Sequence, residues 1–320
     1  MKDKISIIVG GTGQFGICLS KFLIKKKHKV VITTRFPNKA KKIYKKDSKI
    51  IISKLNVLSL KNINDILIKY KPKYIFYFAG LSSPKISFKK QKETYLSNYK
   101  GCENFLKVIK KNSLNLKFLN ASSCEIFAPN KSELGLKSKM KPVSPYGKAK
   151  LLSFNITKSY REQFNLKSYN AVIFNTESLY REKHFLIPKI CIAAINAFKY
   201  KSKTSFGNIN IAREWNWCEE QVKYILKFIE KKPQDFLLSN QRTYSAYQML
   251  AFAFEYFNLD YKRYILQDKK HFRPNDFKKK KSNSQSYFKK NDISYKYKIY
   301  GRKMINKIIK YYLNELKHKF

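Results

Sequence analysis

The chain has 320 residues, of which 43% are hydrophobic, and a formal net charge of +47. Its 24 Phe and 23 Tyr supply material for a sizeable buried core and argue against intrinsic disorder. No apolar run approaches the ~20 residues that a membrane-spanning helix needs, and five scattered Cys give neither a disulfide framework nor a zinc site. We therefore expect a globular, cytoplasmic protein without a bound metal and without a membrane partner.

The positive charge comes from 68 Lys and Arg against 21 Asp and Glu, and only 8 of the basic residues are Arg. An excess of Lys spread along the whole chain is typical of a solvated surface, so we expect no nucleic-acid partner. The field would still attract an anionic substrate. A non-catalytic nucleic-acid-binding protein stays open as an alternative, and salt-sensitive retention on nucleic acid would favour it.

Strand-like and helix-like patterns alternate through the first half of the chain. The predicted strands are residues 5–9, 29–33, 49–52, 74–78, 116–120 and 168–174. The predicted helices between them are residues 15–25, 63–69, 94–109 and 145–164. This alternation indicates an α/β fold, a Rossmann-type doubly wound parallel sheet whose ligands bind beyond the carboxyl ends of the strands.

The alternation weakens after residue 174. Further helices are predicted at residues 186–198, 219–231, 244–257 and 304–316, whereas residues 268–302 show weak periodicity. We therefore expect a dinucleotide-binding domain over residues 1–174 and a smaller, mixed substrate-binding lobe over residues 175–320.

A glycine-rich turn follows the first predicted strand. Gly10, Gly13 and Gly16 are spaced as G-x-x-G-x-x-G between that strand and a helix. Glycine lets the backbone approach a pyrophosphate, at which the positive end of the helix points. The pattern predicts a dinucleotide site, with a plain strand–turn–helix as the alternative.

The second predicted strand ends in Thr33-Thr34-Arg35, without the Asp or Glu that usually contacts the ribose of NAD. Arg35 could pair with a 2′-phosphate in a bidentate manner, so NADP is favoured over NAD. A solvated surface Arg is the alternative.

A second motif predicts hydride-transfer chemistry. Tyr146 and Lys150 are four residues apart and share one helix face, where the ammonium can stabilise a phenolate that takes up a hydroxyl proton. Ser123 lies just beyond the fifth predicted strand and could orient a substrate. Glu125, two residues further, adds a base that hydride transfer alone does not need; an exposed loop carboxylate is the alternative for this residue.

These motifs resemble those of the GDP-mannose 4,6-dehydratase family, within the extended short-chain dehydrogenases/reductases. The matching stretches are GGTGQFG (10–16), ASSCEIFA (121–128), SPYGKAK (144–150), SYREQF (159–164), IFNTES (173–178), GNINIAREW (207–215) and FRPND (272–276). The resemblance implies an NADP-dependent lyase that converts GDP-mannose to GDP-4-keto-6-deoxymannose. Such an enzyme oxidises the sugar at C4, eliminates water across C5–C6 and returns hydride to C6. It also implies a homodimer or homotetramer.

The resemblance implies a role for each matching position. The catalytic residues would be Ser123, Glu125, Tyr146 and Lys150, with Glu125 as the elimination base. The cofactor-binding residues would be Gly10, Thr12, Gly13, Gln14, Phe15, Gly16, Arg35, Asn56, Ala79, Ser82, Lys150 and Arg181. The substrate-binding residues would be Ser87, Asn175, Lys189, Arg213 and Arg273.

Several positions depart from the family's pattern, chiefly near the substrate. Thr176 replaces a cofactor-proximal His, His184 replaces an Asn, and Pro188 replaces an Arg beside the substrate. These changes leave room for a dehydratase of another nucleotide-sugar, such as GDP-heptose. A nucleotide-sugar epimerase or reductase is a further alternative, against which Glu125 argues.

Overall fold

The computed structural model describes residues 4–44, 47–128, 133–268 and 279–317. Its contacts divide the chain into two compact units. The first unit comprises Met1–Ala128, Leu136–Ile173 and Gln221–Leu238, and the second comprises Pro129–Gly135, Phe174–Glu220 and Ser239–Phe320. Residues 221–238 belong to the first unit although residues 174–220 before them belong to the second, so the division is not a single cut along the chain.

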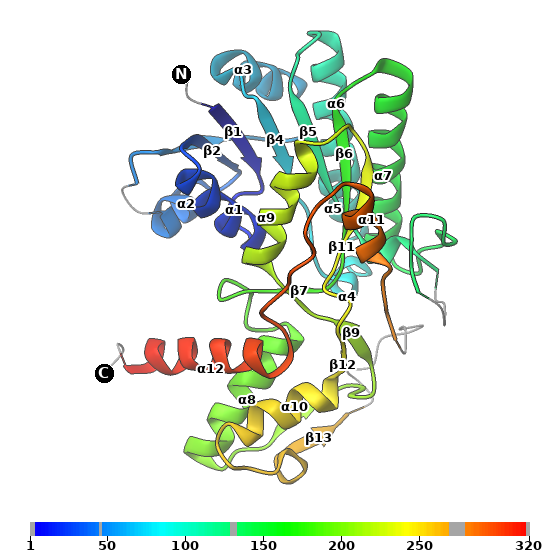
Figure 1. Cartoon of the computed structure of the whole chain (residues 1–320). Helices are drawn as coiled ribbons and strands as arrows, with labels where there is room; N and C mark the ends of the chain where they lie inside the picture. The colour runs from blue at the N-terminus through cyan, green and yellow to red at the C-terminus, as the bar shows by residue number, and fades with distance from the viewer. Residues whose placement is uncertain (1–3, 45–46, 129–132, 269–278, 318–320) are drawn as a thin grey trace. The chain divides into compact units, whose positions relative to one another are not determined.

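The first unit is built on a seven-stranded sheet with the order β11-β6-β5-β4-β1-β2-β3, in which every pair is parallel (Figure 1). Its strands are β1 (Lys4–Val9), β2 (His28–Thr34), β3 (Ile50–Lys54), β4 (Tyr74–Tyr77), β5 (Lys117–Ser123), β6 (Ser168–Ile173) and β11 (Asp235–Leu238). The six strands predicted for the N-terminal half are therefore confirmed. The strand order reverses between β1 and β4, and a doubly wound sheet binds its ligands at the carboxyl ends of the strands beside such a reversal.

Helices cover the sheet, as the fold class requires. Three of them share one core with alternate residues of the strands, namely α3 (Leu60–Tyr70), α6 (Gly101–Lys111) and α7 (Pro145–Phe164). The other helices that contact the strands include α1 (Gln14–Lys25), α2 (Pro37–Tyr44) and α9 (Cys218–Ile229). Phe228 of α9 stacks on Phe236 of β11 with ring centroids 4.1 Å apart. This contact packs α9 against β11, the strand at one edge of the sheet.

The helix predicted over residues 94–109 is interrupted. It consists of α5 (Gln91–Tyr95), a π-helical turn η1 (Leu96–Lys100) and then α6. The fully buried Asn98 lies in η1, and its Nδ2 donates to the carbonyl oxygens of Leu81 and Thr94. The π-helical turn thus places a buried amide under the loop that follows β4.

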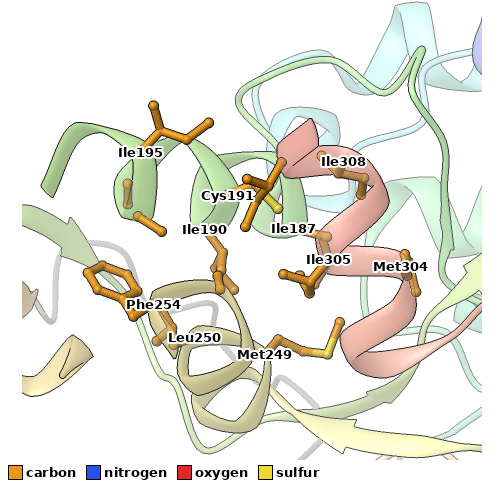
Figure 2. Packing of buried hydrophobic residues seen from close by; sticks show 14 of the residues in the cluster. Ile187, Ile190, Cys191, Ile195, Met249, Leu250, Phe254, Met304, Ile305 and Ile308 are labelled. Carbon is orange, nitrogen blue, oxygen red and sulfur yellow. The ribbon is translucent and has the colours of Figure 1, made fainter. Parts of the chain in front are cut away.

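The second unit has its own core, formed by α8 (Leu186–Tyr200), α10 (Ala246–Glu255) and α12 (Gly301–Lys317). Figure 2 shows Ile190 of α8, Leu250 of α10 and Ile305 of α12 among the buried side chains of this cluster. Three two-stranded sheets complete the unit: β7 (Thr176–Glu177) with β10 (Asn216–Trp217), β9 (Ala212–Glu214) with β12 (Thr243–Ser245), and β8 (Thr204–Phe206) with β13 (Ile265–Gln267).

The helices predicted after residue 174 are all present, with α9 belonging mostly to the first unit. The weakly periodic stretch also contains a short helix that we did not predict, α11 (Ser284–Lys290). Among the described residues, no helix is long and apolar enough to cross a membrane.

Candidate active site

The glycine turn joins β1 to α1 as predicted, and packing within the protein leaves no room for a Cβ atom at Gly10, Gly11 or Gly16. Gly10 has φ +84°, and a Cβ atom there would lie 2.7 Å from the backbone nitrogen of Ala79. A Cβ atom at Gly16 would lie 2.4 Å from the carbonyl oxygen of Gly11. These close approaches hold the first turn of α1 against the glycine turn, and the glycine turn against the backbone after β4.

Gly13 is different, because the protein leaves room for a side chain at this position. A Cβ atom there would meet only the carbonyl oxygen of Gly10, at an ordinary 3.6 Å. Gly13 is the N-cap of α1, it is exposed, and its φ of −83° is accessible to any residue. A pyrophosphate that approaches the backbone at a helix N-terminus would explain glycine here, so the turn fits a dinucleotide.

Arg35 stands at the end of β2 and is exposed. The backbone N–H groups of Gly10 and Gly11 both point to the carbonyl oxygen of Thr33, at 3.3 and 3.4 Å, which places the glycine turn beside this strand end. The guanidinium carbon of Arg35 lies 5.5 Å from the ring centre of Phe36. With no carboxylate in residues 33–36, nothing in this segment repels an anion.

The remaining predicted cofactor positions of the first unit follow the ends of β1, β3 and β4. They are Thr12, Gln14, Phe15, Asn56, Ala79 and Ser82. Phe15 stacks on Phe78 with ring centroids 5.3 Å apart, and Asn56 Oδ1 accepts the backbone N–H of Leu58 at 3.0 Å. Both side chains therefore make local contacts within the protein, and their role in cofactor binding stays a prediction.

The four predicted catalytic residues come from β5, the short turn η2 (Cys124–Ile126) and α7, all within the first unit. Ser123 Oγ accepts the backbone N–H of Glu125 at 3.2 Å, which fixes the turn that presents the half-buried Glu125. Tyr146 and Lys150 lie on one face of α7, with Lys150 Nζ 5.9 Å from the ring centre of Tyr146. The structure thus brings Tyr146 close to Lys150 and Ser123 close to Glu125, and the catalytic roles of these four residues stay predictions.

Burial changes the protonation equilibrium of Lys150. Its side chain is buried, and Nζ donates to the carbonyl oxygen of Ala121 at 2.7 Å. Burial disfavours the charged form and lowers the pKa of Lys150 from 10.5 to about 8. Lys150 therefore still carries its proton at neutral pH and can stabilise an adjacent phenolate.

Ser87, a predicted substrate-binding residue, is hydrogen-bonded within the first unit. It closes the short helix α4 (Pro84–Ser87) and is fully buried. Its hydroxyl donates to the carbonyl oxygen of Pro84 at 2.6 Å and accepts the backbone N–H of Tyr146 at 3.1 Å. Both contacts are internal, so Ser87 helps to hold the first turn of α7 in place, and its role in substrate binding stays a prediction.

Arg181, a predicted cofactor ligand, belongs to the second unit. Its guanidinium carbon lies 3.4 Å from the ring centre of Phe185, and its Nε lies 3.8 Å from Glu177 Oε2. Burial raises the pKa of the Glu177 carboxyl to about 7, against the opposing effect of Arg181. Sequence reasoning did not single out Glu177, although this acidic residue lies within one of the matched stretches.

The predicted substrate residues of the second unit have internal contacts. The Asn175 carbonyl oxygen accepts from Asn216, Lys189 Nζ donates to the Ser205 carbonyl oxygen at 2.6 Å, and Arg213 is buried. Arg273 lies outside the described residues. The roles of these four residues stay predictions.

Within the described part of the chain, no group of His, Cys, Asp and Glu is arranged to hold a metal ion, and the five Cys are buried and form no disulfide. Sequence reasoning also missed Asn98, whose amide supports the loop after β4. Its sequence signal was weak, because nearby residues such as Ser97 and Lys100 are also polar.

Comparison with known proteins gives a consistent result. A family model described as GDP-mannose 4,6 dehydratase matches residues 7–304. GDP-mannose 4,6 dehydratase 1 of Arabidopsis thaliana is 25% identical over 300 residues, 85% of this chain and 80% of the relative. GDP-mannose 4,6-dehydratase of Vibrio cholerae is 26% identical over 268 residues, 78% of this chain and 71% of the relative.

Solved structures share the fold at low sequence identity. A UDP-N-acetylglucosamine 4-epimerase from Methanobrevibacter ruminantium has a TM-score of 0.85 and 19% identity, covering 98% of this chain and 100% of that chain. A dTDP-glucose 4,6-dehydratase from Streptomyces venezuelae, solved with NAD, has a TM-score of 0.85 and 13% identity, covering 97% of both chains. The resemblance carried by the motifs is confirmed over nearly the whole sequence: the chain belongs to the GDP-mannose 4,6-dehydratase family.

Proposed function

We propose that the protein is a nucleotide-sugar 4,6-dehydratase that converts GDP-mannose to GDP-4-keto-6-deoxymannose with NADP as its cofactor. Family membership supports the reaction class. The observation that carries the proposal is the packing of the first turn of α7 on the turn after β5. A Cβ atom at Gly147 would lie 2.5 Å from the Glu125 carbonyl oxygen. An acid residue and a Tyr–Lys pair are thereby held on adjoining elements.

The redox step uses the residues of β5 and α7. The Tyr146 phenolate removes the proton of the sugar C4 hydroxyl, and the Lys150 ammonium stabilises the negative charge of that phenolate. The Ser123 hydroxyl donates a hydrogen bond to the C4 oxygen and orients it. Bound beside these residues, NADP would supply the hydride-transfer chemistry that oxidation at C4 and reduction at C6 require.

The elimination step needs Glu125. A ketone at C4 acidifies the proton on C5, and the Glu125 carboxylate removes that proton. The C6–O bond then breaks, and the C6 hydroxyl leaves as water with a proton supplied by the same carboxyl group. Simple epimerisation at C4 requires no base at this position, which favours a dehydratase over an epimerase.

The choice of NADP rests on Arg35. Its guanidinium is exposed at the end of β2, where no carboxylate competes with a 2′-phosphate. For the nucleotide-sugar we propose contacts from Asn175, Lys189, Arg213 and Arg273, as the family resemblance implies. The oligomeric state we propose, a homodimer or homotetramer, is checked by size-exclusion chromatography with light scattering.

Mass spectrometry of the reaction tests the proposal. Purified protein is incubated with GDP-mannose and a trace of NADP, and we expect the sugar to lose one water without net formation of NADPH. The matched variant Glu125→Gln keeps the size of the side chain but removes the base. We expect it to bind NADP normally and to produce no dehydrated sugar. Full dehydration by this variant would exclude the role of Glu125, and no reaction by the wild type would direct the search to other nucleotide-sugars, GDP-heptose first.

A further inference from the structure

The helix that carries Tyr146 and Lys150 rests on the sheet through polar side chains. Lys150, Ser153, Thr157 and Arg161 follow one another at intervals of three, four and four residues, so they form one stripe along α7. The first three are buried, and the Arg161 side chain is only 14% exposed. A helix face that packs on a sheet is ordinarily apolar, so this stripe needs polar partners.

Three neighbouring strands supply those partners. Asn120 of β5, Asn170 of β6 and Asp235 of β11 are in register across the sheet. Asn120 Nδ2 donates to Asn170 Oδ1 at 2.9 Å, and Asn170 Nδ2 donates to Asp235 Oδ1 at 2.9 Å. Asp235 Oδ2 is 2.8 Å from Arg161 Nη2, so the series of polar contacts across the sheet ends at a side chain of α7. We call these four residues, Asn120, Asn170, Asp235 and Arg161, the polar ladder.

The polar ladder is connected to the turn of α7 that holds Lys150. Asn120 Nδ2 also makes a long hydrogen bond to Ser153 Oγ, at 3.4 Å, and Ser153 Oγ donates to the Lys150 carbonyl oxygen at 3.0 Å. The Lys150 ammonium is held by the carbonyl of Ala121, the residue that follows Asn120 on β5. The backbone and the side chain of Lys150 are therefore both tied to one dipeptide of β5. Figure 1 shows α7 running beside β6 in the first unit.

Stability alone does not explain this arrangement. Burying two amides and an ion pair costs desolvation free energy that their hydrogen bonds only partly offset, and well-packed apolar side chains would hold a helix at least as firmly. Apolar burial, however, has no preferred direction, whereas hydrogen bonds require a narrow range of distances and angles. A polar ladder therefore fixes where α7 sits along its own axis.

We propose that Asn120 and Ser153 are positioning residues for Lys150. The polar ladder fixes the position of α7 relative to β5 with the precision that catalysis by Tyr146 and Lys150 requires. Catalytic groups have to be held within about 0.5 Å of their productive geometry. A ladder that joins three strands to the helix gives this precision without touching substrate. The inference rests on the proposed function for its kinetic readout.

The test compares three variants. Ser153→Ala removes the hydroxyl that links Asn120 to the Lys150 carbonyl, and alanine favours the helix, so folding should persist. Asn120→Leu removes the first member of the polar ladder. The control is Tyr74→Phe, which removes the 2.6 Å hydrogen bond between Tyr74 and Glu230 from the same sheet but leaves the polar ladder intact.

With GDP-mannose as substrate, we expect kcat to fall about tenfold or more in Ser153→Ala and Asn120→Leu, because a small misplacement of catalytic groups has a large effect on rate. KM should change by less than about twofold, since no substrate contact is lost. The acid limb of the pH profile of kcat should move to higher pH, because a displaced Lys150 stabilises the phenolate less. Tyr74→Phe should retain the wild-type kcat and profile. Equal behaviour of all three variants would overturn the inference.

A second readout separates this inference from the proposed function. If the wild type converts no GDP-mannose, the proposed function fails, and hydrogen exchange in the absence of substrate decides the role of the polar ladder. We then expect amides of residues 146–154 to exchange about tenfold faster in Ser153→Ala and Asn120→Leu than in Tyr74→Phe. Equal exchange in this segment would refute the positioning role.

Discussion

Gly147 lies directly against the backbone of Glu125. A Cβ atom at residue 147 would be 2.5 Å from the Glu125 carbonyl oxygen and 2.8 Å from Pro142 Cβ. Real Cβ atoms do not come so close to a backbone oxygen, so only glycine permits this contact. The contact is between backbones, and it holds the turn that bears the proposed base next to the residue that follows Tyr146.

Replacing Gly147 by alanine should therefore damage the site as well as the fold. Either α7 or the turn η2 has to move, and we expect an overpacking cost of about 1–3 kcal/mol in the free energy of unfolding. The rate of water loss from GDP-mannose should fall by a larger factor than stability alone explains, because Tyr146 and Glu125 move apart. Urea denaturation and mass spectrometry measure the two effects. A variant with normal stability and normal turnover would contradict this account of the contact.

Gly13 and Gly16 form a matched pair for testing the dinucleotide site. Gly16→Ala would place a Cβ atom 2.4 Å from the Gly11 carbonyl oxygen, so we expect a less stable protein. Gly13→Ala would meet only the Gly10 carbonyl oxygen at 3.6 Å, so we expect wild-type stability. Its NADP affinity should nevertheless fall about tenfold or more, because the new methyl group occupies the approach to the helix N-terminus. Thermal denaturation and calorimetric titration separate the two cases, and undiminished affinity in Gly13→Ala would argue against a phosphate at this turn.

The features that the sequence predicted correctly are those that depend on residues close together in the chain. The strand–glycine–helix start and the Tyr146–Lys150 spacing depend on neighbours within a few residues, and the structure has both. Strand β11 was missed because it is a run of four residues that becomes a strand only by pairing with β6. Its periodicity is too short to distinguish a strand from the end of a helix.

The supporting residues of the site could not be predicted in the same way. Asn120, Asn170 and Asp235 are hydrogen-bonded to one another across 50 and 65 positions of the chain, so no spacing in the sequence relates them. Ser87 likewise has contacts that its motif does not predict, because its hydroxyl is hydrogen-bonded to Pro84 and Tyr146. Such contacts depend on the tertiary structure.

Cofactor preference should depend on Arg35. Arg35→Ala removes a guanidinium that we expect to pair with the 2′-phosphate of NADP, and charged hydrogen bonds of this kind correspond to about ten- to hundredfold in affinity. NAD, which lacks that phosphate, should bind the variant and the wild type equally. Isothermal titration with both dinucleotides measures the change. The control is Lys61→Ala, which removes one exposed positive charge from α3 and should leave both affinities near wild type. Parallel losses for NADP and NAD in Arg35→Ala would assign the residue a role other than phosphate recognition.

The buried Lys150 makes the stability of the cofactor-free protein depend on pH. Burial lowers its pKa from 10.5, the value that applies to the unfolded chain, to about 8 in the folded protein. Between these two pH values the unfolded chain binds a proton that the folded protein does not, so raising the pH favours the folded state. Below pH 8 both states are protonated, and this group contributes no slope.

Comparison with Lys150→Met isolates this contribution, because other titrating groups, such as the buried tyrosines, are common to both proteins. The free energy of unfolding of the wild type, relative to Lys150→Met, should rise by up to about 3 kcal/mol as the pH increases from 8 to 10.5. The difference should be constant below pH 8, where the wild type buries a charge that methionine lacks. Urea denaturation of both proteins at a series of pH values measures it. A difference that stays flat across the alkaline range would mean that Lys150 keeps its ordinary pKa in the folded protein and that its ammonium is not desolvated as the structure indicates.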